Sequence, residues 1–484
     1  MGIDTIIAFN KNMSTDYKNY FKDKKITVMG LGLLGRGIGD VKFLAACGAE
    51  LTVTDLKSED ELAPAIEELA RDLTPEQFNN INFVLGEHRL EDFRDCDMLL
   101  RAPNAPLDSE YLAEARAHRV SIKMDASLFV ELAPKDITIV GVTGTRGKTT
   151  VSHIIFDIAK RWFHSRYLDH GAPRERRVVL AGNTRGTATL PLLAEVESGD
   201  IVVLELDSWQ LQGFGEAKIS PHIGVFTCFY PDHLNYYKGL LERYFDDKTH
   251  VFSHQSPKDT LIIGTQINKL FEERFITPPS RLIIARGRDL PSELNLRMIG
   301  EHNKSNVAMA LAVVKLLGVE ENFAREAASA FSGVQHRLQH VGVKHGVVYY
   351  NDTTATSPEG VRAALRALQS YAGRVILLAG GADKGLDYGE LVEIFPEYLK
   401  AIILFKGAAS DKIFEKIMEK PDSRRAEFEI ASQCTSMVEA LKRANDIAEP
   451  GDVVLLSPGA ASFGVFKNEY DRGDQFIAGV KKIV

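Results

Sequence analysis

A glycine-rich turn with a lysine carries the most direct chemical signal in the sequence. The stretch GVTGTRGKTT occupies residues 141–150 and directly follows the apolar segment 137–140. A strand that leads through such a turn into a helix typically holds a polyphosphate, because backbone N–H groups and the helix N-terminus face the anion. We therefore predict that Lys148 lies near the terminal phosphates and that the Thr149 hydroxyl faces Mg²⁺. The other predicted phosphate contacts of this loop are Gly144, Thr145, Gly147 and Thr150.

This loop departs from the general phosphate-binding template at one position. Val142 occupies the place, five residues before Gly147, where the template has its first glycine. A plain connection between a strand and a helix is the alternative interpretation of such a turn. The order of strand, turn and helix favours phosphate binding.

Two further segments place acidic and imidazole groups at the ends of predicted buried strands. Glu205 ends the apolar stretch 201–206, and His233 follows the stretch 222–227. Open α/β sheets bind ligands at the carboxyl ends of their strands. A carboxylate and an imidazole at neighbouring strand ends could hold a second cation beside the one at Thr149. For a histidine considered alone, a structural role is the alternative.

A second glycine loop lies nearer the N-terminus. The sequence GLGLLG at 30–35 follows a predicted strand at 26–29, and Asp55 ends the next strand, twenty residues after Gly35. This pattern is typical of dinucleotide binding and makes an NAD-dependent oxidoreductase the rival hypothesis. A diphosphate near a helix N-terminus is all that the loop requires, so a nucleotide-sugar diphosphate satisfies it equally. A dehydrogenase would not need the second phosphate loop or the groups that follow it.

The elements that must position these groups form three successive series of strands and helices. A chain of 484 residues is expected to form about three domains at ~150 residues each. Alternation of strands and helices predicts parallel, doubly wound sheets, and we predict α/β domains at 1–134, 135–334 and 335–484. The expected strands lie at 26–29, 50–54, 81–84, 98–100, 120–123, 137–140, 178–181, 201–206, 222–227, 260–263, 374–379, 401–405 and 452–456.

Charge and cysteine usage exclude several classes of partner. The chain has 58 basic and 66 acidic residues and a net charge of −8, so its overall charge does not favour binding to nucleic acid or to an anionic membrane. No apolar run approaches the length of a membrane span. The four cysteines are scattered, which favours a reducing compartment and hence the cytoplasm. The polar and basic segment 163–177 is predicted to be a surface loop.

Taken together, the motifs of this chain resemble those of the Mur ligase family. They recur in family order over nearly the whole chain, and their joint specificity far exceeds that of a single glycine loop. The resemblance is greatest to the branch that adds D-glutamate to UDP-N-acetylmuramoyl-L-alanine. The segments are GVTGTRGKTT at 141–150, GNT at 182–184, ELDSWQL at 205–211, DH at 232–233, GEHNKSN at 300–306, HR at 336–337, ND at 351–352, GGADK at 380–384 and LLSPGAAS at 455–462.

The resemblance implies a fold and a reaction. The fold would comprise a Rossmann-like UDP-binding domain, a P-loop ATPase-like central domain and a Rossmann-like C-terminal domain that binds the amino acid. The reaction would be an ADP-forming ligation in peptidoglycan synthesis, and hence in cell-wall biogenesis, cell shape and cell division. It passes through an acyl phosphate on the alanine carboxylate, which the amine of D-glutamate attacks. ATP, two Mg²⁺ ions, small-molecule substrates and a monomer are expected.

The resemblance also assigns the catalytic and metal-binding roles. It implies that Lys148 holds the ATP phosphates and that Thr149 and Glu205 serve one Mg²⁺. His233 would serve the other ion. Lys248 matches a position where the family carries a carbamylated lysine, for which a surface ion-pairing lysine is the alternative.

Substrate contacts follow from the resemblance in the same way. Asn303 and Asn306 match residues beside adenine, and Arg337 with Asp352 matches a clamp from the C-terminal domain onto ATP. The nucleotide-sugar positions are Gly32, Leu33, Leu34, Asp55 and Asn183. The D-glutamate positions are Thr356, Lys384, Ser462 and Phe463, with Lys384 suited to pair a carboxylate.

Several positions depart from the usual family pattern. Asp207 adds a negative charge after the metal glutamate, and the segment RAPN at 101–104 departs from the usual Ser-Pro-Gly near the uridine site, with Asn104 in place of the glycine. Thr354 and Glu469 stand in the part of the chain associated with the incoming amino acid. The same chemistry with another amino acid therefore stays open. A nucleotide-binding regulator without catalysis, which keeps the fold, is a further alternative.

Overall fold

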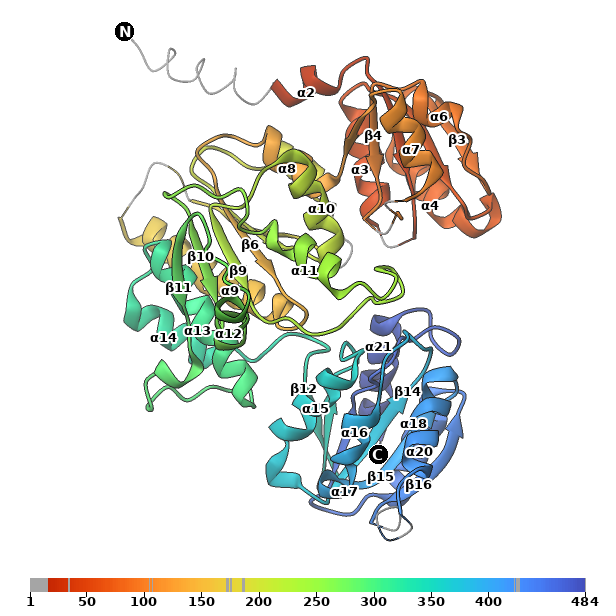
Figure 1. The fold of residues 1–484 in the computed structure, drawn as a ribbon, viewed down its shortest axis with the longest axis vertical. Coiled ribbons are helices and arrows are strands. Elements are labelled where there is room, and N and C mark those ends of the chain that lie inside the picture. Colours follow the sequence, from red (N-terminus) through yellow and green to blue (C-terminus); the bar gives the residue numbers. More distant parts are fainter. Residues whose placement is uncertain are drawn as a thin grey trace.

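The computed structural model describes residues 16–33, 35–103, 105–106, 108–170, 174, 176–184, 188–421, 423 and 427–483. Their helices and strands form three α/β units that follow one another along the chain, each around its own sheet (Figure 1). The predicted fold class of three consecutive α/β domains is confirmed. The boundaries expected at 134/135 and 334/335 stay a prediction.

The N-terminal unit contains a fully parallel sheet in the order β3-β2-β1-β4-β5. Its strands are β1 (Lys25–Met29), β2 (Glu50–Asp55), β3 (Ile81–Leu85), β4 (Met98–Arg101) and β5 (Ser121–Lys123). Its helices are α2 (Asp16–Phe21), α3 (Arg36–Ala46), α4 (Glu59–Asp72), α5 (Pro75–Asn79), α6 (Glu91–Arg94) and α7 (Glu110–Ala117). The glycine loop joins β1 to α3, as the sequence predicts.

The central unit contains a parallel sheet in the order β11-β10-β9-β6-β8-β7. Its strands are β6 (Thr138–Thr143), β7 (Val178–Gly182), β8 (Ile201–Glu205), β9 (Ile223–Phe226), β10 (Thr260–Ile263) and β11 (Arg281–Ile284). Its helices are α8 (Asp125–Leu132), α9 (Lys148–His170), α10 (Ser208–Ala217), α11 (Leu241–Thr249), α12 (Thr265–Glu273), α13 (Glu301–Leu316) and α14 (Glu321–Ala330), with short 3₁₀ turns η1 (Leu190–Ala194) and η2 (Gly287–Asp289).

The C-terminal unit contains a sheet in the order β12-β13-β17-β14-β15-β16, parallel except for the antiparallel pair β12 and β13. Its strands are β12 (Gln339–Lys344), β13 (Val347–Asn351), β14 (Val375–Gly380), β15 (Leu399–Phe405), β16 (Glu429–Cys434) and β17 (Val453–Leu456). Its helices are α15 (Pro358–Ala367), α16 (Gly389–Glu393), α17 (Phe395–Tyr398), α18 (Ala408–Met418), α20 (Met437–Ile447) and α21 (Glu469–Lys481), with one 3₁₀ turn, η3 (Gln369–Tyr371).

Helices cover both faces of the C-terminal sheet. Along β14, Leu377 belongs to the cluster that contains Leu365 of α15, whereas Leu378 belongs to the cluster that contains Leu441 of α20. Successive side chains of a strand point to opposite faces, so a strand covered on both sides must be apolar throughout. The continuous apolar run of β14 is therefore explained by burial on two faces.

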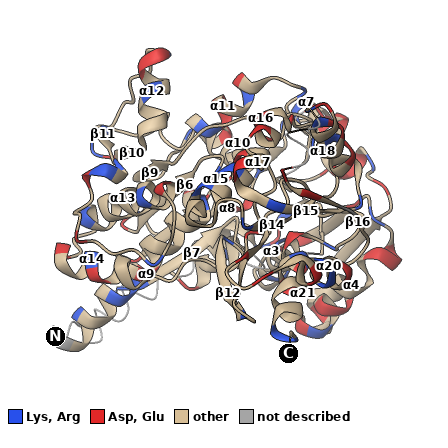
Figure 2. Cartoon of the chain, turned by 90° about the horizontal axis from the view of Figure 1, so that it is seen from below, with Lys and Arg blue, Asp and Glu red and all other residues tan. Residues whose placement is uncertain are grey.

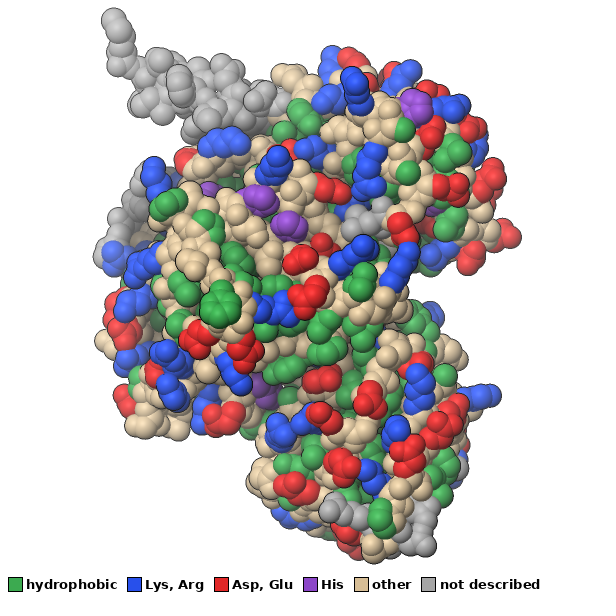
Figure 3. All heavy atoms as spheres, viewed as in Figure 1, with side chains coloured by type: hydrophobic (Ala, Val, Ile, Leu, Met, Phe, Trp, Pro, Cys, Tyr) green, Lys and Arg blue, Asp and Glu red, His purple; other side chains and the backbone are tan. Residues whose placement is uncertain are grey.

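The units differ in how they contact one another. A single hydrophobic cluster contains Val28 of the N-terminal sheet, Phe129 of α8 and Leu204 of the central sheet. The C-terminal unit instead has clusters of its own. In Figure 3, the visible face is hollowed between the N-terminal and C-terminal units. A shared apolar cluster thus joins the first two units, whereas the third has its own clusters, and Ile299 of the preceding segment packs against one of them.

Four strands were not predicted from the sequence: β11, β12, β13 and β16. The hairpin of β12 and β13 turns through His345 and Gly346, both with positive φ, at 51° and 77°. Two such residues are typical of the tightest hairpin turns, whose usual sequence signal is Asn-Gly or Asp-Gly. Strand β12 has only exposed and half-buried residues, so it lacks the buried apolar run that identified the inner strands.

The prediction that the whole of segment 163–177 is a surface loop is wrong. Helix α9 continues to His170, because Trp162 packs edge-on against Phe323 of α14 with the ring centroids 5.1 Å apart. Farther along, Arg174 pairs with the fully buried Asp200 at 2.7 Å. Apolar and ionic partners thus order much of the segment.

Charge is distributed without a dominant sign. Figure 2 shows basic and acidic residues interspersed along the helices. Among the residues that the structure describes, no helix combines the length and the apolar character needed to cross a membrane.

Candidate active site

The predicted phosphate-binding loop joins β6 to α9, and its glycines are required by packing. Gly144 and Gly147 have φ values of 141° and 83°. A Cβ atom at Gly144 would lie 2.0 Å from Thr227 Oγ1, and one at Gly147 would lie 2.6 Å from Asn306 Oδ1. Neither the backbone conformation nor the space admits a side chain. The loop is therefore held open by its own glycines at the N-terminus of a long helix, which suits it to an anion.

Lys148 lies folded back onto this loop. Its Nζ donates to the carbonyl oxygens of Gly144, at 3.0 Å, and Thr145, at 3.4 Å. Burial lowers the pKa of Lys148. Two backbone carbonyls hold the amine in place without neutralising it by an ion pair, so it can turn to a bound phosphate.

Thr149 connects the loop to two other elements. Its Oγ1 donates to Glu205 Oε1 at 3.0 Å and accepts from Nη2 of Arg337 at 3.0 Å. Glu205 is buried at the end of β8, and Arg337 comes from the segment that enters the C-terminal unit. The structure thus brings together three predicted site residues from distant parts of the chain.

The donor set at Thr149 and Glu205 fits Mg²⁺. A hydroxyl and a carboxylate oxygen side by side are ligands that this ion prefers. Nowhere in the described part of the chain do three His, Cys, Asp or Glu side chains gather in a way that could hold a metal. An ion at Thr149 would complete its shell with water and substrate oxygens, as Mg²⁺ usually does.

His233 occupies a pocket of aromatic rings rather than the side of Glu205. Its ring lies 4.6 Å from the centroid of Trp209 and 6.2 Å from that of Tyr244. Burial lowers the pKa of His233 to about 4, although Asp232 opposes this shift. The imidazole is therefore neutral at physiological pH. No hydrogen bond among the described residues joins it to Thr149 or Glu205.

Lys248 is a buried residue, not a surface lysine. Its side chain on the last turn of α11 is 1% exposed, and its Nζ donates to Gly144 O at 3.1 Å. The same carbonyl accepts from Lys148. Burial, reinforced by the charge of Lys148, lowers the pKa of Lys248 to about 7. A surface ion pair is excluded as the role of Lys248.

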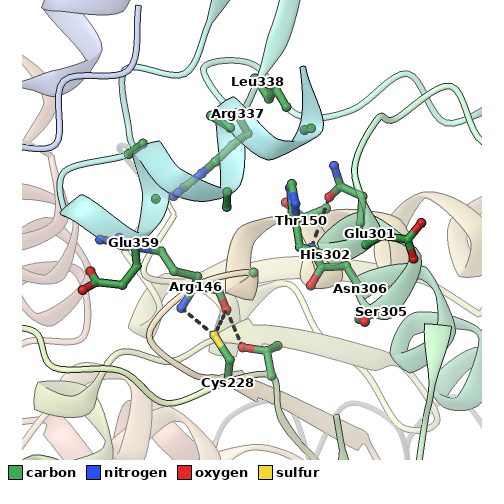
Figure 4. Close-up of a pocket in the computed structure, with 18 of the residues that line it drawn as sticks. Arg146, Thr150, Cys228, Glu301, His302, Ser305, Asn306, Arg337, Leu338 and Glu359 are labelled. Atoms are coloured by element: carbon green, nitrogen blue, oxygen red, sulfur yellow. Dashed lines mark hydrogen bonds between the residues drawn. The ribbon is translucent and has the colours of Figure 1, made fainter. Parts of the chain in front are cut away.

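A pocket of about 600 Å³ opens beside the loop, between the central and C-terminal units. Figure 4 shows Arg146 and Cys228 on one side, Asn306 of α13 on another and Arg337 above. Asn306 donates from Nδ2 to Oδ1 of Asn303 at 3.2 Å. The size of this pocket and its mainly apolar lining with a few polar groups suit a nucleotide next to the phosphate loop.

Asp352 supports the far wall of that pocket. Its carboxylate accepts from the backbone N–H of Leu338 and from the hydroxyl of Ser457, each at 3.0 Å. Burial raises the pKa of Asp352 to about 6. Since Leu338 follows Arg337 directly, Asp352 holds the segment that carries the guanidinium.

The residues expected to contact the amino acid lie across the interface between units. Lys384 Nζ is 3.3 Å from Asp232 Oδ1 and 3.3 Å from Thr356 Oγ1. Ser462 Oγ is buried without a hydrogen-bond partner among the described residues, and Phe463 is 64% exposed. The structure thus gathers the predicted amine, which is paired with Asp232, two hydroxyls and an exposed ring in the C-terminal unit.

Two of the departures from the family pattern have structural roles. Asp207 caps α10, accepting from the backbone N–H of Gln210 at 2.7 Å. The Thr354 hydroxyl donates to His336 O at 2.8 Å. Glu469 is the first residue of α21. Asn104 lies outside the described residues.

The N-terminal glycine loop is closed by Asp55. Its Oδ2 accepts from the backbone N–H of Gly32 at 3.0 Å, and its Oδ1 accepts from that of Lys57 at 3.0 Å. Leu33 is half exposed on this loop, and Leu34 lies outside the described residues. The buried carboxylate therefore fixes the conformation of the loop.

Sequence reasoning missed three charged residues at the site. Arg36 reaches Asn183, Arg146 lines the nucleotide pocket, and Asp232 contacts Lys384. The available signals were an arginine directly after the first glycine loop, an arginine inside the second one, and an acidic neighbour of His233. Arg146 and Lys384 hold the pKa of Asp232 below its usual range, although its burial acts to raise it.

Comparison with protein families identifies two regions of the chain. The Mur ligase middle domain matches residues 142–285, and the family described as Mur ligase, glutamate ligase domain matches residues 336–459. The chain is 35% identical to UDP-N-acetylmuramoylalanine--D-glutamate ligase of Roseiflexus sp. (strain RS-1), over 94% of this chain and 97% of the relative. It is 32% identical to the enzyme of the same name from Borreliella afzelii (strain PKo), over 96% and 98%.

Solved structures share the fold. The UDP-N-acetylmuramate-alanine ligase MurC of Thermotoga maritima superposes with a TM-score of 0.57 at 16% identity, covering 95% of this chain and 99% of that one. The MurF ligase of the same organism, solved in complex with ADP, gives 0.55 at 16% identity, covering 96% and 97%. From the family domains, the full-length relatives and the shared architecture, we conclude that this chain belongs to the Mur ligase family.

Proposed function

We propose that this protein is an ATP-dependent ligase that adds D-glutamate to UDP-N-acetylmuramoyl-L-alanine and forms ADP and phosphate. The observation that carries the proposal is the contact of Arg337 with Thr149, beside Glu205 and the glycine loop. This contact places the Thr149 hydroxyl, the Glu205 carboxylate and the positively charged side chains of Lys148 and Arg337 around one phosphate-binding turn. The names of the full-length relatives support the choice of substrates.

The chemistry requires two steps. In the first, an oxygen of the alanine carboxylate attacks the γ-phosphorus of ATP, an O–P bond forms, and the bond to the β-phosphate breaks to release ADP. In the second, the D-glutamate nitrogen attacks the acyl carbon, the C–N bond forms, phosphate leaves and the amine loses a proton. An amide thus forms at the expense of one phosphoanhydride.

Electrostatic repulsion is the main obstacle to the first step. Two unit negative charges about 4 Å apart repel by roughly 4 kcal/mol at an effective dielectric constant of 20. Lys148 and Arg337 lie where they would offset this repulsion on the transferred group. Thr149 and Glu205 would hold Mg²⁺, which supplies further positive charge when bound. His233 is the proposed ligand of a second ion, since its imidazole is neutral.

Lys248 is proposed to act as a carbamate. Its neutral amine attacks the carbon of CO₂, a C–N bond forms and one proton is released, which converts a cation into a carboxylate. The support for this step is geometric, because the amine is enclosed beside Lys148 and accepted by Gly144 O. A negative group there would offset the charge of Lys148 and orient cations near the loop.

The remaining assignments concern the substrates. The nucleotide pocket with Asn303, Asn306 and Asp352 would bind ATP, and the Gly30-to-Gly35 loop would bind the uridine diphosphate. Thr356, Lys384, Ser462 and Phe463 would bind D-glutamate. We further propose a monomer in the cytoplasm, because one chain supplies every assigned group and Cys47, Cys96 and Cys228 form no disulfides.

Phosphate release from ATP tests the proposal. The assay contains Mg²⁺ and UDP-N-acetylmuramoyl-L-alanine, with D-glutamate, L-glutamate or another amino acid in separate reactions. Release that requires both the nucleotide and D-glutamate supports the proposal, and release with another amino acid moves the specificity to that acceptor. Nicotinamide reduction without ATP consumption would instead support the oxidoreductase hypothesis. ATP binding without release in any reaction would support a regulator.

A further inference from the structure

Arg36 connects the two substrate-facing loops of the N-terminal and central units. It is the first residue of α3, directly after the N-terminal glycine loop. Its Nη2 donates to Asn183 Oδ1 at 3.1 Å and to Gly182 O at 3.3 Å. Its Nε lies 3.8 Å from Oδ2 of the buried Asp125. One side chain thus spans from a helix N-terminus in one unit to a strand end in the next.

The backbone at Asn183 is itself fixed to the carboxylate strand. Its N–H donates to Glu205 O at 2.7 Å. Gly182 has a φ of 86°, and a Cβ there would lie 2.2 Å from the same carbonyl. Asn183 is therefore tied to Glu205 through its backbone and to Arg36 through its side chain. A substrate that extends from the glycine loop to Glu205 must pass this pair.

The chemistry of the pair decides which atom of Asn183 faces outward. A guanidinium has donors and no acceptor, so it can bond only to the oxygen of the amide. The Nδ2 hydrogens then point away from Arg36, and no other described residue accepts them. Asn183 is half-buried, whereas Arg36 is 22% exposed, so both lie at the edge of the site.

We propose that Arg36 is a positioning residue that orients the Asn183 amide, so that Asn183 donates an N–H to an oxygen of the acyl portion of the nucleotide-sugar substrate. The proposal rests on the proposed function and deepens it. In this arrangement, the part of the substrate site at Asn183 selects a substrate that carries a hydrogen-bond acceptor there, such as a carbonyl or carboxylate oxygen. A substrate without such an oxygen would leave the Asn183 N–H donor unpaired, which disfavours its binding.

Four variants and one control separate this role from general support of the fold. Arg36→Met removes the donors and keeps the aliphatic stem, and Arg36→Lys keeps one cationic donor. Asn183→Asp keeps the acceptor for Arg36 and removes the N–H donor. Asn183→Ala serves as the background for a double-mutant cycle. Arg71→Met, on the exposed surface of α4, is the matched control.

The readouts are KM for UDP-N-acetylmuramoyl-L-alanine, KM for ATP, and Kd for UDP alone. We expect Arg36→Met to raise KM for the nucleotide sugar at least tenfold, with KM for ATP and Kd for UDP changing less than threefold. Arg36→Lys should recover part of the loss, and Asn183→Asp should lose at least as much as Arg36→Met. In the Asn183→Ala background, Arg36→Met should add less than twofold.

Five results would overturn the inference. Additive losses in the cycle mean that Arg36 acts independently of Asn183. An equal loss of affinity for UDP alone assigns Arg36 to the diphosphate. A parallel rise in both KM values with a lower Tm assigns it to the fold. If the wild-type protein does not bind the nucleotide sugar, both the proposed function and the inference are wrong. If the wild-type protein is active and Arg36→Met leaves KM for the nucleotide sugar unchanged, only the inference is wrong.

Discussion

Arg337 donates from Nη2 to Thr149 Oγ1 across 3.0 Å, joining residues 188 positions apart. Thr149 is in the first turn of α9 and Arg337 precedes the first strand of the C-terminal unit. The main hydrophobic clusters of the two units are separate, and polar contacts of this kind contribute to the association between them. Interfaces between domains commonly permit relative motion, and in such a motion Arg337 would carry its charge toward the phosphate loop.

Replacement of Arg337 tests the value of that contact. We expect Arg337→Ala to lower kcat by about 10²–10³, the range typical for loss of one group that stabilises developing charge. Arg337→Lys should retain part of the activity, because it keeps the charge but not the planar fork. Steady-state phosphate release measures both. Arg288→Ala, at an exposed arginine, is the control, and an Arg337→Ala variant as active as that control would exclude the clamp.

Lys248 offers a test by chemical rescue. With a pKa of about 7, roughly half of its amine is neutral at pH 7, the form that reacts with CO₂. We expect Lys248→Ala to be inactive and to regain part of its turnover when acetate or propionate is added. Wild-type turnover should also fall in buffer freed of CO₂ and recover with bicarbonate.

The rescue requires a matched comparison. Sodium chloride at the same ionic strength must not restore Lys248→Ala, since screening alone is not a carboxylate. Full activity of the variant without any additive would remove Lys248 from the mechanism.

Asp352 predicts a specific dependence of stability on pH. Burial raises its folded-state pKa from 3.8 to about 6, so the folded protein binds this proton more tightly than the unfolded chain. The stability contributed by protonation is present below pH ~4 and is lost as pH rises through 6, about 3 kcal/mol in all. Asp352→Asn should therefore gain Tm relative to wild type between pH 4 and pH 7.

Thermal unfolding of both proteins across that range measures the effect. Asparagine can still accept from Leu338 N–H, and its amide can donate to the Ser457 hydroxyl, so the fold should be kept. A Tm difference that is constant with pH would contradict the assignment.

Arg101 is buried between the N-terminal and central units with an incomplete set of partners. Its Nη2 donates to Gln212 Oε1 at 3.1 Å and lies 3.8 Å from Glu216. Its Nε and Nη1 make no hydrogen bonds among the described residues, and burial lowers its pKa. A buried charge of this kind contributes little net stability compared with an apolar side chain of the same shape.

Two substitutions at Arg101 should therefore have different effects. Arg101→Met should change the free energy of unfolding by less than about 1 kcal/mol or stabilise the protein. Arg101→Ala should cost about 2–4 kcal/mol, because it leaves a cavity between the units. Denaturant unfolding monitored by fluorescence compares them. Equal destabilisation by both would show that the charge, not the volume, is what the interface needs.

Local patterns in the sequence determined the architecture and the reactive loop. Apolar runs identified most inner strands, since strands covered on both faces must be apolar throughout. The turn from Gly144 to Thr149 was equally predictable, because glycine, lysine and threonine must stand at fixed spacing to receive phosphates. The half-exposed β12 and the helical continuation to His170 escaped prediction, since both depend on partners elsewhere in the chain.

Tertiary structure alone decided which side chains meet. Arg36 and Asn183 are 147 positions apart, and Lys384 and Asp232 are 152 apart, so no spacing rule links either pair. The burial of Lys248 likewise depends on how α11 packs beneath the loop, and this burial lowers its pKa. The sequence determines which reactive side chains are present and, through short-range sterics and hydrogen bonding, the local backbone structure that carries them. The fold specifies distance and dielectric environment, which set the reactivity of those groups.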